Sequence, residues 1–286
     1  MSTQTFAAGE TARTREFDFR DEDFQALRAL IKRLSGINLA DSKRELVYGR
    51  VSRRLRALGM NGFGDYRRLL EEDSGELVEF CNAMTTNLTA FFREPHHFEY
   101  LRKEFLEPRM RDPGASRRIR IWSTACSSGE EPYSLAITVA EVFGKLDRWD
   151  VKILATDLDS NILEKARQGI YAEERVRGLD PALISRYFRV SQHAGRSVYS
   201  VVPELAGMIT FKPINLMHEL PMKGPLDVVM CRNVIIYFDK ESQRDLFSRI
   251  APLQRSGDLL FLGHSESLFK VSNDYNLIGR TIYRRN

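Results

Sequence analysis

Cysteine and long apolar runs are both scarce in this sequence. Its 286 residues include three cysteines, Cys81, Cys126 and Cys231, which are odd in number and lack metal-ligand spacing. This pattern argues against a disulfide framework and suits a reducing compartment, so we expect a cytoplasmic protein. No stretch approaches the roughly 18 apolar residues that a membrane-spanning helix needs, and the polar N-terminus lacks an apolar core of signal-peptide length. We therefore expect no membrane insertion.

Neither sign of charge is in large excess. The chain is 43% hydrophobic and 29% charged, with a formal net charge of +4. These values describe an ordinary globular chain of one or two domains. The mild positive charge permits an anionic partner, but it lacks the strong phosphate-binding footprint of a dedicated nucleic-acid protein.

The N-terminal part of the sequence predicts a flexible tail over residues 1–20 and then a helical domain over 21–86. Apolar residues at three- and four-residue spacing predict a first helix after acidic cap residues, in "DEDFQALRALIKRLSG". Two shorter helices are expected around 63–72 and 75–86. They complete a small all-helical unit.

Between these helices, residues 42–59 predict a helix with two unlike faces. Its expected apolar stripe consists of Leu46, Val47, Val51, Leu55 and Leu58. The basic residues Arg50, Arg53 and Arg56 lie largely away from that stripe. We expect one face to pack and the other to be cationic, either as a recognition surface or as an ordinary solvated face.

The remainder of the chain predicts an α/β domain. Residues 87–116 are expected to form a linker and a connecting helix with Pro95 in its first turn. From 117 to 286, apolar strands alternate with helices, which indicates a parallel sheet covered on both faces. Short β-like pieces around a turn at 193–195 predict a small antiparallel insertion at about 188–213. Ligands of such sheets bind beyond the carboxyl ends of the strands.

The loop "STACSSGEEPYS" (123–134) follows the first predicted strand and begins a helix. A phosphate-binding loop uses closely approaching glycines and usually a lysine. This loop has one glycine, no lysine, and the carboxylates of Glu130 and Glu131, which would repel phosphate. An ammonium and a sulfonium group fit better, as in S-adenosylmethionine, although acidic residues also favour the first turn of any helix.

Polar residues follow the next two strands as well. Asp157 ends the strand in "ILATDLD", where a carboxylate can accept hydrogen bonds from both ribose hydroxyls, while Asp159 is a simpler helix cap. Arg232 and Asn233 come directly after a buried run, and Tyr237 follows them. Three strand ends therefore contribute to one predicted mouth.

Five ordered motifs carry a resemblance to a known family. They are "NLTAFFRE" (87–94), "GEEPYS" (129–134), "ATDLD" (155–159), "CRNVIIYF" (231–238) and "GHSE" (263–266). Together they resemble the chemotaxis receptor methyltransferases, the CheR family, from about residue 20 to the end. The resemblance implies transfer of a methyl group from S-adenosylmethionine to glutamates on the cytoplasmic helices of chemoreceptors, with S-adenosylhomocysteine as product. It also implies a Rossmann-like methyltransferase domain with a small antiparallel β insertion, preceded by an all-helical domain.

The resemblance also assigns roles to individual residues. The residues that it places in the cofactor pocket are Asn87, Thr89, Arg93, Glu131, Asp157, Asn215, Leu216, Arg232 and Asn233. Among these, it gives Glu131 the methionine ammonium, Asp157 the ribose, and Asn215 with Leu216 the adenine. Arg93 is placed near the reacting centre and Tyr237 beside the transferred methyl. Because Glu130 adjoins Glu131, the choice between the two stays open at this point.

Two partners are implied for the rest of the chain. Lys43, Arg50, Arg53 and Arg56 are expected to recognise the glutamate-rich receptor helices, and in some family members the β insertion grips a tether peptide at the receptor C-terminus. We expect a monomer.

The chemistry needs few protein groups. A glutamate carboxylate is already ionised at neutral pH, so the site must supply alignment and exclusion of water. No Ser-His-Asp arrangement and no metal cluster is recognisable, and we expect no metal. His96 and His97 would point about 100° apart on a helix, which makes them poor joint ligands. His264 is expected either to border the pocket or to make a structural hydrogen bond.

Two other function classes share some of these features. A nucleic-acid methyltransferase would use the same cofactor domain, but an amino-directed enzyme should carry an Asn-Pro-Pro-Tyr type of motif where this chain has Arg-Asn-Val-Ile-Ile-Tyr. We therefore expect no nucleic-acid partner. A non-catalytic signalling adaptor would bind the cofactor without turnover, and Arg93, Asp157 and Tyr237 argue against it.

Overall fold

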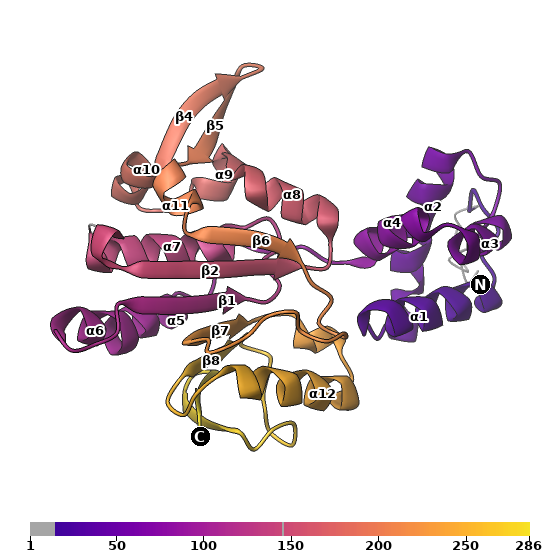
Figure 1. The fold of residues 1–286 in the computed structure, drawn as a ribbon. Coiled ribbons are helices and arrows are strands. Elements are labelled where there is room, and N and C mark those ends of the chain that lie inside the picture. Colours follow the sequence, from indigo (N-terminus) through magenta and orange to yellow (C-terminus); the bar gives the residue numbers. More distant parts are fainter. Residues whose placement is uncertain (1–14, 145) are drawn as a thin grey trace, which may run out of the picture.

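The computed structural model describes residues 15–144 and 146–286 (Figure 1). The N-terminal helices are α1 (Asp21–Ser35), α2 (Arg44–Leu58), α3 (Phe63–Glu72) and α4 (Ser74–Met84), with a single 3-10 turn, η1 (Asp41–Lys43), before α2. All four predicted helices are confirmed. They enclose a core of their own that includes Phe24, Val51, Tyr66 and Phe80.

Two expectations for this domain are corrected. Of the expected tail, residues 1–14 lie outside the described residues, but Phe19 is buried and its ring centroid lies 4.4 Å from that of Phe63. The described part of that range, residues 15–20, therefore packs onto the helices through Phe19, because this side chain is large and apolar. In α2, Val47, Val51 and Leu55 are buried as predicted, whereas Leu46 and Leu58 are 38% and 41% exposed. The packed stripe is narrower than the periodicity suggested.

A broken helix connects the two domains. It consists of α5 (Pro95–Tyr100), a π-helical turn η2 (Leu101–Leu106) and α6 (Glu107–Arg111). Pro95 occupies the first turn of α5, as predicted, where its missing N–H costs no hydrogen bond.

The main sheet has the strand order β6-β2-β1-β7-β8-β10-β9. Its parallel strands are β1 (Arg118–Ser123), β2 (Asp150–Asp157), β6 (Ile209–Pro213), β7 (Val228–Cys231) and β8 (Leu259–Leu262). An antiparallel hairpin, β9 (Tyr275–Gly279) and β10 (Ile282–Arg285), extends the edge beside β8. Figure 1 shows β2 and β6 running toward the N-terminal helices, so the carboxyl ends of these strands face that domain.

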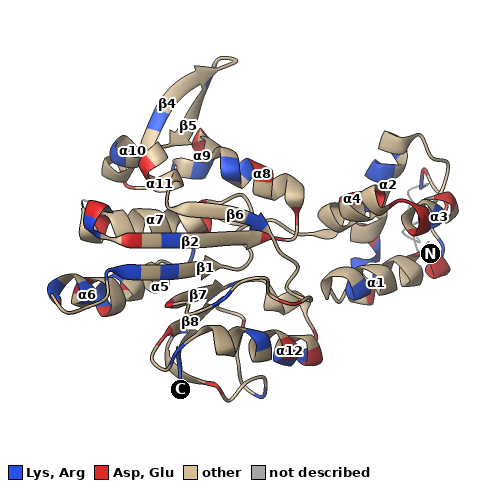
Figure 2. Cartoon of the chain, in the orientation of Figure 1, with Lys and Arg blue, Asp and Glu red and all other residues tan. Residues whose placement is uncertain are grey.

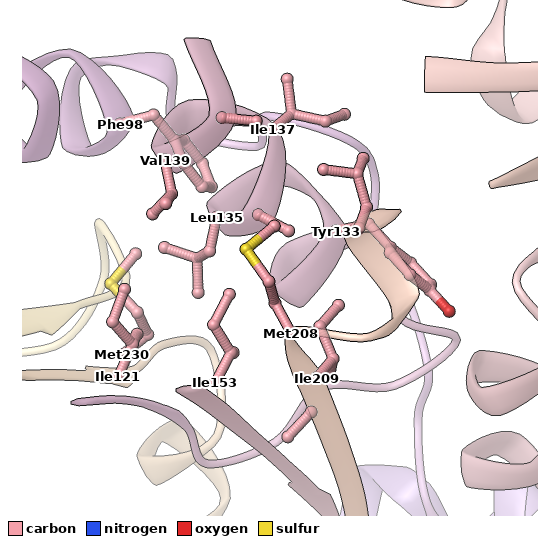
Figure 3. Packing of buried hydrophobic residues seen from close by; sticks show 14 of the residues in the cluster. Phe98, Ile121, Tyr133, Leu135, Ile137, Val139, Ile153, Met208, Ile209 and Met230 are labelled. Atoms are coloured by element: carbon pink, nitrogen blue, oxygen red, sulfur yellow. The ribbon is translucent and has the colours of Figure 1, made fainter. Parts of the chain in front are cut away.

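The sheet is covered on both faces, as predicted. The principal helices are α7 (Glu130–Phe143), α8 (Ser160–Gln168) and α12 (Lys240–Ile250), with short 3-10 segments η3 (Leu146–Arg148), η4 (Ile235–Tyr237) and η5 (Ala251–Leu253). Figure 3 shows Leu135 and Val139 of α7 close to Ile121, Ile153 and Met230 from the strands, all members of one buried cluster. Side chains alternate along a strand, so Trp122 packs on the opposite face with α12.

A second, three-stranded antiparallel sheet confirms the predicted insertion but changes its limits. Its order is β3-β5-β4, from β3 (Ile170–Ala172), β4 (Phe188–His193) and β5 (Arg196–Val201). The short helices α9 (Glu173–Val176), α10 (Pro181–Tyr187) and α11 (Pro203–Ala206) surround it. The expected range of 188–213 omitted β3 and wrongly included β6, which pairs with β2 in the main sheet. Short β-like runs do not reveal their distant partners.

No helix among the described residues is long and apolar enough to cross a membrane.

Candidate functional site

The described residues form a cavity of about 410 Å³ where the helical domain meets the carboxyl ends of β1, β2 and β7. A cavity of this size can hold a cofactor. The helical domain contributes residues of 35–46, and the connecting segment contributes 84–90 and Arg93. The sheet side contributes Thr124, Ala125, Ser127, Glu131, Asp157, Leu158, Ile214, Asn215, Leu216, Arg232, Asn233 and Tyr237.

The single glycine of the loop after β1 serves packing. Gly129 has φ +96°, a conformation that side-chain-bearing residues rarely adopt. A Cβ atom there would lie 2.9 Å from the hydroxyl of Tyr171 and 3.0 Å from the Cβ of Ala166. The glycine therefore lets α7 begin against α8 and the small sheet, and it does not form a phosphate cradle.

The two adjacent glutamates at the start of α7 point to different surroundings. Glu130 is fully buried and accepts hydrogen bonds from Ser128 Oγ (2.6 Å) and Arg175 Nε (2.8 Å), on the side of the small sheet. Glu131 lines the cavity, where its Oε1 accepts from Ser123 Oγ (2.7 Å) and its Oε2 accepts from Arg232 Nη1 (2.9 Å). Burial raises the pKa of Glu131, and Arg232 and the Ser123 hydroxyl oppose that rise. Of the two, Glu131 is the one that faces the cavity.

Asp157 ends β2 with its carboxylate held by the main chain. Its Oδ2 accepts from Ser127 N (2.8 Å) and its Oδ1 from Asp159 N (3.0 Å). Burial raises its pKa to about 6, and the two N–H donors act in the opposite direction. Asp159 caps α8 through Asn161 N (3.0 Å), as predicted, and also accepts from Asn87 Nδ2 (2.7 Å). Asn87 also lines the cavity, and its side-chain amide donates to the residue that caps α8.

Arg232 connects the third strand end to the other two. Its buried guanidinium donates to Glu131 and to the carbonyl oxygen of Arg93, and it lies 3.4 Å from an oxygen of Glu94. Asn233, next in the chain, has φ +58° and turns the chain out of β7. Tyr237 lines the cavity, and its carbonyl oxygen accepts from Asn38 N (2.8 Å) of the helical domain.

The other predicted pocket residues also line the cavity. Thr89 and Arg93 are half-buried, and Arg93 Nη1 donates to the carbonyl oxygen of Leu88 (2.8 Å). Leu216 is buried. Asn215 uses both ends of its amide internally, because Nδ2 donates to Leu34 O (2.6 Å) and Oδ1 accepts from Met217 N (3.0 Å). A ligand that used this amide would have to compete with those bonds.

Two family models match this chain in tandem. Residues 22–85 match the CheR methyltransferase all-alpha domain, and residues 87–284 match the CheR methyltransferase SAM binding domain. The chain belongs to the CheR methyltransferase family. The boundary between the two matches falls at the junction of α4 with the connecting segment. The chain is accordingly an S-adenosylmethionine-dependent methyltransferase.

Curated CheR-family proteins are similar to this chain along almost its whole length. A chemotaxis protein methyltransferase of Klebsiella aerogenes is 46% identical over 92% of this chain and 89% of its own length. That of Escherichia coli is 42% identical over 98% of both chains. Chemotaxis protein methyltransferase 2 of Pseudomonas aeruginosa is 44% identical over 94% of both.

In this CheR-family chain, the basic residues of the predicted cationic face have different surroundings from one another. Arg50 is half-buried, and its Nη1 donates to the carbonyl oxygens of Met84 (2.5 Å) and Thr85 (2.7 Å). That guanidinium holds the end of α4, so it is engaged within the domain and does not project freely from the helix. Arg56 is exposed but paired with Glu16 (2.6 Å). Figure 2 shows basic and acidic positions mixed over these helices, and not one uniformly basic face.

The other two residues of the predicted recognition set lie in different places. Arg53 is exposed on α2. Lys43, just before α2, lines the cavity itself. Arg53 therefore lies on the helix surface, whereas Lys43 lies at the cavity.

The two histidines of α5 lie closer together than helix geometry suggested. Their ring centroids are 4.2 Å apart, and one ligand atom from each lies within 4.8 Å of a Glu94 oxygen. Glu94 has φ +60°, so the chain turns sharply just before α5, and the Glu94 side chain lies near the two histidines. Burial and the nearby Arg232 charge lower the pKa of His97 to about 3, which keeps it neutral. Arg232 already places a cation 3.4 Å from the Glu94 carboxylate, which disfavours a second cation there.

Sequence reasoning missed an apolar part of the cavity mouth. Leu88 and Ile236 line the cavity and are 75% and 50% exposed, and Leu46 lies there too. Apolar residues are normally assigned to the core, so no sequence signal separates these from packing residues. The mouth therefore presents apolar surface beside the basic Lys43 and Arg93.

Proposed function

We propose that this chain transfers the methyl group of S-adenosylmethionine to glutamate side chains of chemoreceptors, giving glutamate methyl esters and S-adenosylhomocysteine. One observation carries most weight: Glu131, in the first turn of the helix that follows β1, and Asp157, at the end of the neighbouring strand β2, face one cavity. Among the described residues, the loop between β1 and that helix has one glycine, which serves packing, and no lysine. The similarity to chemotaxis protein methyltransferases over nearly the full chain supports the choice of acceptor. The enzyme acts as a cytoplasmic monomer without a metal.

In this proposal, opposite ends of the cofactor meet different residues. The Glu131 carboxylate binds the methionine ammonium, while Arg232 limits the negative charge there. Asp157 is fixed by two main-chain N–H groups, which leaves lone pairs of its oxygens for the ribose hydroxyls. Leu216 and the Asn215 segment border the adenine, and Asn87, Thr89 and Asn233 complete the wall.

The acceptor carboxylate enters from the mouth. Bound S-adenosylmethionine supplies a methyl group made electrophilic by its positive sulfur. The attacking glutamate is ionised at neutral pH, so no general base is needed. Lys43 and Arg93 attract that carboxylate, and Tyr237 with the apolar mouth residues excludes water around it. Arg53 contacts the acidic receptor helix beyond the mouth.

The small sheet offers a second contact to the receptor. In the order β3-β5-β4, strand β4 is an edge strand, and residues 189–193 are exposed. An extended peptide can add to such an edge through main-chain hydrogen bonds. We place the C-terminal tether peptide of the receptor at this edge.

The test is transfer of label from methyl-labelled S-adenosylmethionine to membranes that contain chemoreceptors. Alkali-labile label on the receptor band is the expected result, because carboxyl methyl esters hydrolyse in mild alkali. Label that resists alkali, or label recovered in nucleic acid, would overturn the proposal.

A further inference from the structure

Glu266 lies in the "GHSE" turn after β8 and is only 5% exposed. Its carboxylate accepts hydrogen bonds from five main-chain N–H groups. Oε2 accepts from Asn233 (2.8 Å) and Gly263 (2.5 Å), and Oε1 accepts from Val234 (2.9 Å), Ile235 (2.9 Å) and Ile236 (3.3 Å). Four of these donors are consecutive residues of the segment that follows β7.

Consecutive N–H groups that converge on one point form an anion-binding concavity. Here the left-handed Asn233, followed by the 3-10 turn Ile235–Tyr237, aims the donors inward. The protein fills this concavity with its own carboxylate. Gly263 allows the approach, since a Cβ there would lie 2.8 Å from Glu266 Oε2 and 2.3 Å from Asn233 Nδ2.

The segment held in this way carries three residues of the cavity wall. Arg232 precedes the four donors, Asn233 is the first of them, and Tyr237 follows the last. Each buried N–H that lost its acceptor would cost roughly 1–3 kcal/mol, so the segment would rearrange to find other acceptors. Such a rearrangement would displace the side chains of Arg232, Asn233 and Tyr237 from their present positions in the cavity wall.

We propose that Glu266 is a positioning residue for methyl transfer, whose carboxylate fills a main-chain anion site and thereby fixes Arg232, Asn233 and Tyr237 in the cavity. It touches neither cofactor nor acceptor. The role belongs to Glu266, whereas His264 of the same motif bonds through Nδ1 to Glu94 (2.9 Å). The inference deepens the proposed function and rests on it for its kinetic part.

Two substitutions separate positioning from simple loss of stability. Glu266→Ala removes the carboxylate and leaves a space that a small carboxylate can enter. Glu266→Gln keeps the volume but turns an amide NH₂ toward main-chain donors. Glu174→Gln, at an exposed site in α9, is the matched control. We expect both Glu266 variants to lose about tenfold or more in kcat, which corresponds to roughly 1.4 kcal/mol, with a smaller change in KM for the receptor.

Formate is the decisive probe. Added formate should restore kcat to Glu266→Ala, leave Glu266→Gln unrestored because its site is filled, and leave the wild type unchanged. Wild-type kcat in Glu266→Gln, or a folded Glu266→Ala that formate does not restore, would overturn the proposal. If Glu266→Ala does not fold, the kcat of Glu266→Gln decides alone.

Binding of S-adenosylhomocysteine separates this inference from the function proposed above. Calorimetry should show weaker binding to Glu266→Ala and recovery with formate, whatever the methyl acceptor is. A wild type that methylates no receptor would refute the proposed function and leave this binding result to stand. Unchanged affinity together with unchanged kcat would refute the positioning role.

Discussion

Replacing Asp157 by Asn should weaken cofactor binding while changing the stability of the fold much less. The carboxylate is buried, and with a pKa of about 6 it is ionised at pH 7.5. The substitution keeps the shape but places an NH₂ group where an oxygen now accepts from Ser127 N or Asp159 N. It also removes an acceptor for a ribose hydroxyl. An unsatisfied buried partner costs about 1–3 kcal/mol, so the Kd for S-adenosylhomocysteine should rise roughly 5- to 150-fold.

The same substitution should change stability much less. A carboxyl whose folded-state pKa lies above its unfolded value makes the folded state less stable as the pH rises from about 4 to about 6. At pH 7.5 that cost is about 3 kcal/mol for a shift from 3.8 to about 6, and Asn removes it. This gain offsets the lost hydrogen bonds, so the melting temperature should stay within a few degrees of the wild type.

Isothermal calorimetry with S-adenosylhomocysteine at pH 7.5 and a thermal melt of the same samples test both parts. Asp65→Asn, exposed on α3, controls for the loss of one carboxylate. Wild-type affinity in Asp157→Asn would refute the assignment of this residue to the cofactor. Weak binding together with a collapsed melting temperature would show that its role is structural.

Three further predictions concern the pH dependence of cofactor binding, two arginines of α2, and Gly129. Affinity for S-adenosylhomocysteine should fall as the pH is lowered through about 6, because Asp157 then becomes protonated; a flat profile from pH 8 to 5 by calorimetry would contradict this. Arg50→Ala should lower the melting temperature, since it frees carbonyl oxygens at the end of α4, whereas Arg53→Ala should leave the melt unchanged and slow receptor methylation; the reverse pattern would exchange their roles. Gly129→Ala should destabilise the fold by more than about 1 kcal/mol in urea unfolding, from its positive φ and the contact with Tyr171, and an unchanged midpoint would refute the packing role.

Much of the cofactor side was predictable because strand ends are local features. A polar residue after a buried run identifies the carboxyl end of a parallel strand, and such ends meet at one edge. That argument placed Asp157 and Arg232 correctly at one cavity. Helix periodicity gave the direction of Arg50, but not the α4 carbonyl groups that it meets across 34 residues of chain.

Features that depend on distant contacts escaped prediction. Strand β6 and the antiparallel pieces look alike in sequence, and only pairing with β2 assigns β6 to the main sheet. The five N–H groups around Glu266 come from two separate segments, so the motif "GHSE" alone does not reveal them. Leu88 is an ordinary apolar residue until the structure shows it 75% exposed at the cavity mouth.

The most direct test of the central claim is residue-level mass spectrometry of a chemoreceptor after incubation with the purified chain and S-adenosylmethionine. We predict methyl esters on glutamate side chains of the receptor's cytoplasmic helices, and fewer of them when Asp157→Asn replaces the wild type at limiting cofactor. A receptor without methyl esters, treated with an enzyme shown by calorimetry to bind S-adenosylhomocysteine, would contradict the account.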